Sequence, residues 1–145
     1  MATERETVGR MEVIRYHTPD LGGQPKASTL LGRTDHLGVV VQVVSKEGGE
    51  TNLHAHSAQD AVWFVLAGRA KFHGKDGESV ELGPKDALFI PKGSPYWFEA
   101  ISEEPLEIMR NSATDPSLKN QRVNYEALRE RQQDGRHADS VYVTS

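Results

Sequence analysis

The stretch that decides the fold runs from Gly48 to Gly68 and reads GGETNLHAHSAQDAVWFVLAG. It places His54 and His56 one residue apart, shortly before the apolar run Ala61 to Ala67. Side chains two residues apart on a β-strand lie on one face, so both imidazoles are expected to point at one place. Imidazole is a ligand for zinc, copper, iron and nickel, which makes the pair a candidate metal site. The alternative is two surface histidines beside a turn.

The rest of the chain predicts short strands separated by glycine and proline. Residues 38–45 are rich in β-branched side chains, as in a buried strand. Asp76-Gly77 lies between the strand-like runs 69–73 and 79–82 and indicates a hairpin. Further strands are expected at 11–16, 28–31, 61–66, 86–90, 96–101 and 106–110. Many short strands favour an all-β sandwich or barrel.

Two spacings resemble the conserved motifs of the cupin superfamily. Gly48, five residues, His54-x-His56 and a later Gly68 resemble the first motif. Gly83 followed by Pro91-Lys92-Gly93 and, after two residues, Tyr96 resembles the second. The resemblance implies a double-stranded β-helix, which is a small jelly-roll barrel. It also implies a single-domain small cupin of the cupin-2 type.

The chain departs from these motifs where the family's metal ligands lie. The family's glutamate falls on Ala61, and the histidine of its second motif falls on Tyr96. Seven residues instead of five separate Gly83 from Pro91. Of the four ligands that the resemblance implies, His54 and His56 are present.

Three nearby residues are candidates for the missing ligands. Asp60 would turn inward if a bulge lies between His56 and Ala61, and without a bulge the Gln59 carbonyl oxygen is a weak neutral ligand. The alternative for both is ordinary hydrogen bonding in the loop. Tyr96 is the candidate catalytic residue, because a phenol beside a metal ligates it, holds a water or acts as a general acid. The alternative for Tyr96 is an aromatic packed at the barrel mouth.

Trp63 and Phe98 share the inward face with this site by strand alternation. They are the candidate substrate-binding residues and would line an apolar pocket for an aromatic or terpenoid-like molecule, or else simply fill the core. Gln42 is the one polar side chain within the strand 38–45 before its final serine, and it is expected to reach the pocket or to bond a neighbouring strand.

Composition excludes several classes of function. The chain has 145 residues and a net charge of −4, and it contains no cysteine, which excludes disulfides, thiolate nucleophiles and cysteine-bound zinc. No basic block points to nucleic acid, no apolar stretch is long enough to span a membrane, and the N-terminus lacks the apolar core of a signal peptide. A single-domain cytoplasmic protein is therefore expected.

Three regions are predicted along the chain. Residues 1–37 form an N-terminal arm with outer strands after a frayed start, 38–112 form the barrel, and 113–145 form a C-terminal tail. The tail is predicted to contain one short helix, YEALRERQQ, capped by Asn124 and ended by Gly135. MEVIRY near the N-terminus and SVYVTS at the C-terminus would suit a homodimer interface.

Three hypotheses of function stay open at this stage. In the first, His54 and His56 hold a divalent iron, nickel, zinc or manganese ion that acts on a small organic molecule, in isomerase, cyclase, lyase or oxygenase chemistry. In the second, the metal site has decayed and the barrel binds a small effector. In the third, a histidine and Tyr96 act as base and acid without metal.

Overall fold

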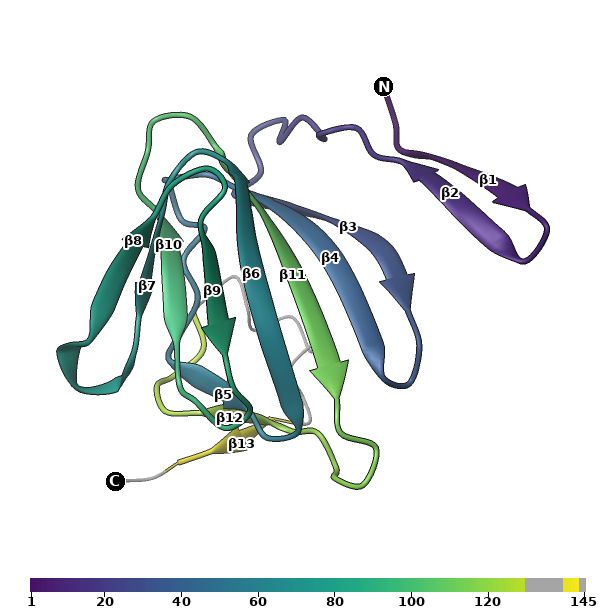
Figure 1. Ribbon diagram of the computed structural model, residues 1–145. Coiled ribbons are helices and arrows are strands. Elements are labelled where there is room, and N and C mark those ends of the chain that lie inside the picture. The colour runs from purple at the N-terminus through teal and green to yellow at the C-terminus, as the bar shows by residue number, and fades with distance from the viewer. Residues whose placement is uncertain (130–139, 144–145) are drawn as a thin grey trace.

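The computed structural model describes residues 1–129 and 140–143 and is built from β-strands around one barrel (Figure 1). One wall is a five-stranded antiparallel sheet. Its strands, from edge to edge, are β3 (Lys26–Arg33), β4 (Leu37–Val44), β11 (Leu106–Thr114), β6 (Gln59–Ala67) and β9 (Ala87–Ile90). The all-β prediction is confirmed.

The opposite wall is made of two three-stranded sheets. The first contains β8 (Ser79–Leu82), β7 (Ala70–His73) and β10 (Trp97–Ala100), and the second contains β5 (His54–His56), β12 (Arg122–Asn124) and β13 (Val141–Tyr142). A β-bridge between His54 and Tyr96 joins the two sheets. As Figure 1 shows, β5, β12 and β13 lie across one end of the barrel.

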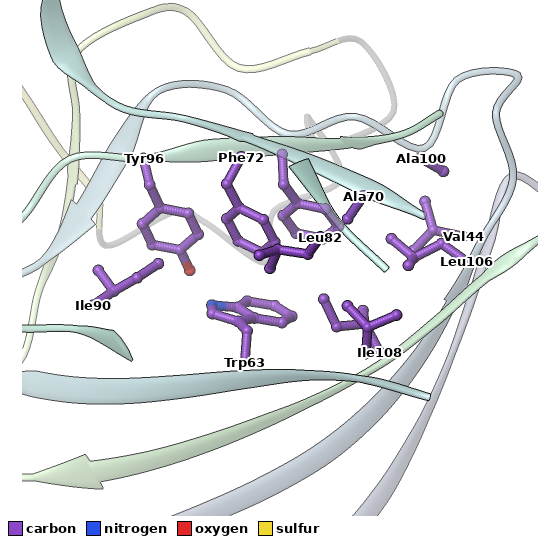
Figure 2. Close-up of a cluster of buried hydrophobic side chains, with 12 residues drawn as sticks. Val44, Trp63, Ala70, Phe72, Leu82, Ile90, Tyr96, Ala100, Leu106 and Ile108 are labelled. Atoms are coloured by element: carbon purple, nitrogen blue, oxygen red, sulfur yellow. The ribbon is translucent and has the colours of Figure 1, made fainter. Parts of the chain in front are cut away.

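The core lies between the two walls (Figure 2). Strand β6 alternates as predicted: Ala61, Trp63 and Val65 are buried, whereas Val62 and Leu66 are exposed. Aromatic rings from the opposite wall pack on this strand, with ring centres of Trp63 and Phe98 5.0 Å apart. The core cluster is Val44, Trp63, Val65, Ala70, Phe72, Leu82, Ile90, Tyr96, Phe98, Ala100, Leu106 and Ile108.

The N-terminal residues are ordered by a hairpin that the sequence analysis did not expect. Strand β1 (Glu4–Val8) pairs with β2 (Met11–Arg15), whereas residues 1–10 were predicted to be frayed. Gly9 has a φ of 64°, which suits the tight turn between them. The hairpin projects away from the barrel (Figure 1). The predicted turn at 74–77 is present as a short 3-10 helix, η1 (Lys75–Gly77).

The helix predicted after Asn124 is absent from residues 125–129, and its remaining residues lie outside the described ones. The reason is that the barrel uses this segment. Asn124 belongs to β12, and its buried amide accepts a hydrogen bond from Asn52 instead of capping a helix. Strands β3 and β12 also belong to the barrel sheets, although the predicted boundaries assigned them to the arm and the tail. Within the described residues, no helix has the length and hydropathy needed to cross a membrane.

Candidate functional site

A cavity of about 530 Å³ opens between the two walls of the barrel, next to β5. The structure brings six of the predicted residues to it: Gln42, His54, His56, Trp63, Tyr96 and Phe98. The remaining lining residues are Gln24, Pro25, Lys26, Ser28, Gly49, Glu50, Thr51, Arg110 and Arg122. Histidines, aromatic rings and cationic side chains therefore share one cavity, and their roles in function stay predictions.

His54 is a buried residue that lines this cavity. Its backbone exchanges hydrogen bonds with Tyr96, at 3.0 and 2.8 Å, and 2% of the residue is exposed. Its Nδ1 lies 2.6 Å from the carbonyl oxygen of Asn52. A carbonyl can only accept, so Nδ1 carries the proton and Nε2 is left as an acceptor.

Burial lowers the pKa of His54 well below its usual value, because a charged imidazole loses its hydration there. The neighbouring positive charge of Arg122 and the nearby His56 lower it further, and Arg110 adds a smaller effect in the same direction. The hydrogen bond to Asn52 opposes these effects without overcoming them. His54 is therefore neutral at physiological pH.

This buried neutral histidine is expected to make the protein less stable in mild acid. The unfolded chain binds a proton at His54 near pH 6.5, whereas the folded chain does not, so the free energy of unfolding falls as pH drops below that value. The fall approaches about 1.4 kcal/mol per pH unit until the lowered pKa of the folded state is reached. Thermal melting between pH 7 and pH 5 measures it.

Replacing His54 by glutamine should flatten this part of the profile, whereas His36→Gln, at an exposed position, should leave it unchanged. A His54→Gln protein that keeps the wild-type slope would show that the acid sensitivity has another source.

Two rings, those of Tyr96 and His56, contact His54. The ring centre of Tyr96 lies 4.6 Å from that of His54, and the ring centre of His56 lies 5.1 Å from it. Figure 2 shows the Tyr96 hydroxyl and the Trp63 indole nitrogen pointing toward each other. Trp63 Nε1 is buried and has no hydrogen-bond partner. A donor left in this state is costly unless a bound molecule or a water accepts from it.

Arg110 is a cavity residue that the sequence analysis missed. It lies on β11 directly opposite Trp63 on β6, with Cζ 5.8 Å from the centre of the indole ring. Its Nη2 donates to Gln59 Oε1 at 3.2 Å, and its Nε is buried without a partner. Alternation with the core residues Leu106 and Ile108 was a signal for its inward position.

Arg122, the second missed cation, comes from β12 and lies opposite His56. Its Nε donates to Asn124 Oδ1 at 3.0 Å, and its Nη2 donates to Asn52 Oδ1. Burial lowers the pKa of Arg122 to about 10, so the group stays charged at neutral pH. Nothing in the sequence around Arg122 indicated that the predicted tail would return to the barrel.

Gln59 and Asp60, the predicted additional metal ligands, are not among the residues that line the cavity. The Gln59 oxygen accepts from Arg110, and its amide nitrogen donates to Thr114 Oγ1 at 3.0 Å. Asp60 Oδ1 accepts from the backbone nitrogen of Lys92 at 2.8 Å and fastens the turn after β9. Both side chains make the ordinary hydrogen bonds that were the alternative for them.

The donor set of the cavity does not fit a resident divalent cation. In residues 1–129 and 140–143, no three histidine, cysteine, aspartate or glutamate side chains are grouped so that they could hold a metal ion. Structural and catalytic zinc sites, by comparison, use three or four protein ligands. Arg110 and Arg122 line the same cavity as the two histidines, and their charge repels a cation.

Comparison with known families agrees with this architecture. Residues 41–110 match the family model described as a cupin domain, and they include both cupin-like motifs together with the second half of β4, all of β6 and β11 as far as Arg110. The barrel is therefore similar to a cupin domain over just under half of the chain. Because the match ends at Arg110, Arg122 on β12 lies in a segment beyond it.

Individual relatives of the chain are distant. Uncharacterized protein MJ1618 of Methanocaldococcus jannaschii is 29% identical over 70 residues, which are 48% of this chain and 55% of that protein, so the match spans about half of the relative. The cupin domain of Schizosaccharomyces pombe Cnp3 superposes with a TM-score of 0.60 at 14% identity, over 79% of this chain and 89% of that one. A double-stranded β-helix protein of Klebsiella pneumoniae has a TM-score of 0.59 at 22% identity, over 68% and 79%. These likenesses confirm the double-stranded β-helix.

Proposed function

We propose that the barrel binds a small organic molecule in the cavity between its walls and does so without a resident metal ion. The observation that carries the proposal is the set of buried polar atoms at the cavity that lack a partner: Gln42 Oε1, Trp63 Nε1 and Arg110 Nε. Buried polar groups in folded proteins are nearly always hydrogen-bonded, so a bound molecule that pairs with them gains affinity. The aromatic rings of Trp63 and Phe98 supply the apolar contact that such sites use.

The metal-dependent enzyme predicted from His54 and His56 has less support. A neutral His54 with Nε2 as an acceptor is suited to ligate a metal, and its Nδ1 bond to a carbonyl is the arrangement found behind many metal-bound histidines. Two imidazoles beside two guanidinium groups are nevertheless a poor site for a cation, for the reasons of charge and ligand number given above.

An enzyme without metal would use the same cavity. His54 Nε2 would accept a proton from the bound molecule, and the Tyr96 hydroxyl would donate one. The ring centres of His54 and Tyr96 lie 4.6 Å apart, so the two groups of this candidate are neighbours. Binding and catalysis differ in one readout, because only catalysis changes the molecule.

Elemental analysis combined with a binding screen tests the proposal. We expect purified protein to contain far less than one iron, nickel, zinc or manganese ion per chain, also after incubation with each metal, and to bind small molecules equally well before and after treatment with a chelator. NMR spectra of the incubated compounds report both binding and chemical conversion. Near-stoichiometric metal that is lost in a His54→Ala/His56→Ala double variant would contradict the proposal, as would binding that the chelator abolishes.

A further inference from the structure

We propose that the molecule bound in the cavity is a small organic carboxylate, which Arg110 and Arg122 bind from the two walls of the barrel. The inference rests on the proposed function, because it assigns the chemical class of the molecule that this cavity takes. It adds residues that neither the cupin motifs nor the two-histidine site includes.

The charge of the cavity favours an anion. Three cationic side chains, Lys26, Arg110 and Arg122, line it together with one carboxylate, that of Glu50. This positive excess occurs in a chain whose net charge is −4, so it is a local feature of the cavity. Desolvation by burial is the main effect that disfavours the charge of Arg122, and the nearby charge of Arg110 adds a smaller effect in the same direction. An anion between them would offset that repulsion.

The two guanidinium groups are held in place before any ligand arrives. Gln59 fixes Arg110 through Nη2, and the amides of Asn52 and Asn124 fix Arg122 through Nη2 and Nε. All of these acceptors are neutral amides, and among residues 1–129 and 140–143 no ion pair joins either arginine to a carboxylate. A planar guanidinium that is already oriented binds a carboxylate with charge-assisted hydrogen bonds at little entropic cost.

Unpartnered atoms next to Arg110 indicate where the carboxylate and the rest of the molecule would lie. Arg110 Nε and Trp63 Nε1 are both buried N–H donors without a partner, and the two residues pair directly across β11 and β6. One carboxylate oxygen would accept from both. Gln42 Oε1, on β4, is a buried acceptor without a partner and would accept from a hydroxyl or amino group. The best fit is thus a carboxylate with a nearby hydroxyl or amino group and an apolar body against Trp63 and Phe98.

Matched probes that differ only in charge test the class of ligand. The panel contains acetate, phenylacetate and mandelate, each beside its neutral amide, and isothermal titration calorimetry measures affinity. The chain has two tryptophans, Trp63 in the cavity and Trp97 outside its lining, so the two indole N–H resonances report where a probe binds. We expect each carboxylate to bind more tightly than its amide, to shift the Trp63 resonance and not that of Trp97, and to bind more weakly as salt is added. Mandelate should bind more tightly than phenylacetate.

Arginine variants test the binding groups. Arg110→Gln and Arg122→Lys should each weaken carboxylate binding by about tenfold or more, which is the loss expected for a charge-assisted hydrogen bond, and leave amide binding unchanged. Arg10→Gln, at an exposed position in the N-terminal hairpin, should leave both unchanged. Melting curves show whether the Arg122 variant is folded, and Arg110→Gln tests the proposal independently of the Arg122 network.

The outcomes separate the inference from the proposed function. Amides that bind as tightly as carboxylates would overturn the carboxylate inference and leave a small-molecule cavity. Carboxylates that bind equally to wild type and Arg110→Gln would also overturn it. Binding of no probe, with no shift of the Trp63 resonance, would contradict both.

Discussion

Replacing Asn52 by leucine is expected to destabilise the protein by roughly 2–4 kcal/mol and to lower its melting temperature by about 10 °C. Asn52 is fully buried, and its amide nitrogen donates to Asn124 Oδ1 at 2.8 Å and to the Glu126 carbonyl at 3.1 Å. Its oxygen accepts from Arg122. Leucine has a similar size, so the loss arises from a buried guanidinium and a buried amide that lack their partner.

The same substitution should also change ligand binding in the cavity, because Asn52 contacts two of the residues that line it. Its side chain holds Arg122 on β12, and its carbonyl accepts from His54 Nδ1 on β5. Asn52→Leu protein that still folds is therefore expected to bind carboxylates more weakly than wild type. Calorimetry with phenylacetate beside a melting curve measures both effects.

Asn111→Leu is the matched control, since the Asn111 amide makes one long hydrogen bond, 3.4 Å, to the Val62 carbonyl. It should change stability by about 0.5 kcal/mol or less. If Asn52→Leu does not fold, Asn124→Leu tests the same hydrogen-bond network from its other side. Where both single variants fold, the double variant should lose less unfolding free energy than the sum of the two single losses. An Asn52→Leu protein that melts like wild type would show that the network does not hold β12 to the barrel.

The sequence predicts the barrel well because its information there is local. Alternation places Trp63 and Val65 inward, and the glycine and proline turns separate strands that the structure contains. The pair His54 and His56 was readable for the same reason, since two residues on one strand share a face. These features depend on the strand period and need no knowledge of distant segments.

The remainder of the site depends on contacts between segments far apart in the chain. Arg122 reaches the cavity because β12 pairs with β5, 66 residues earlier at the His56 position, and no local pattern predicts that pairing. The same pairing explains why no helix begins after Asn124. Asparagine is a good N-cap residue, but the side-chain oxygen of Asn124 accepts hydrogen bonds from Asn52 and Arg122 and so does not cap a helix. The position of Gln59 in the sequence predicts a metal ligand, but its oxygen accepts a hydrogen bond from Arg110 on another strand.

The motif glycines lead to the second large effect: Gly68→Ala is expected to destabilise the protein by about 3 kcal/mol, and Gly93→Ala by about 1 kcal/mol. Both glycines have positive φ, 73° and 81°, so alanine at either position adopts a left-handed backbone at similar cost. The surroundings differ. A Cβ at Gly68 would lie 2.7 Å from the Pro105 carbonyl oxygen and 2.9 Å from Leu106 Cα, whereas a Cβ at Gly93 meets no atom within 4 Å.

Chemical denaturation of the two variants separates backbone strain from close packing. Because the atoms near Gly68 are backbone atoms and Leu106 is fully buried, the clash is relieved only by moving β11 away from β6. That movement would also displace Arg110, which lies on β11 opposite Trp63, so Gly68→Ala should weaken carboxylate binding while Gly93→Ala should not. Equal loss of stability in the two variants would mean that the positive φ alone explains the need for glycine at position 68. The spacing of β6 and β11 would then not depend on the missing side chain of Gly68.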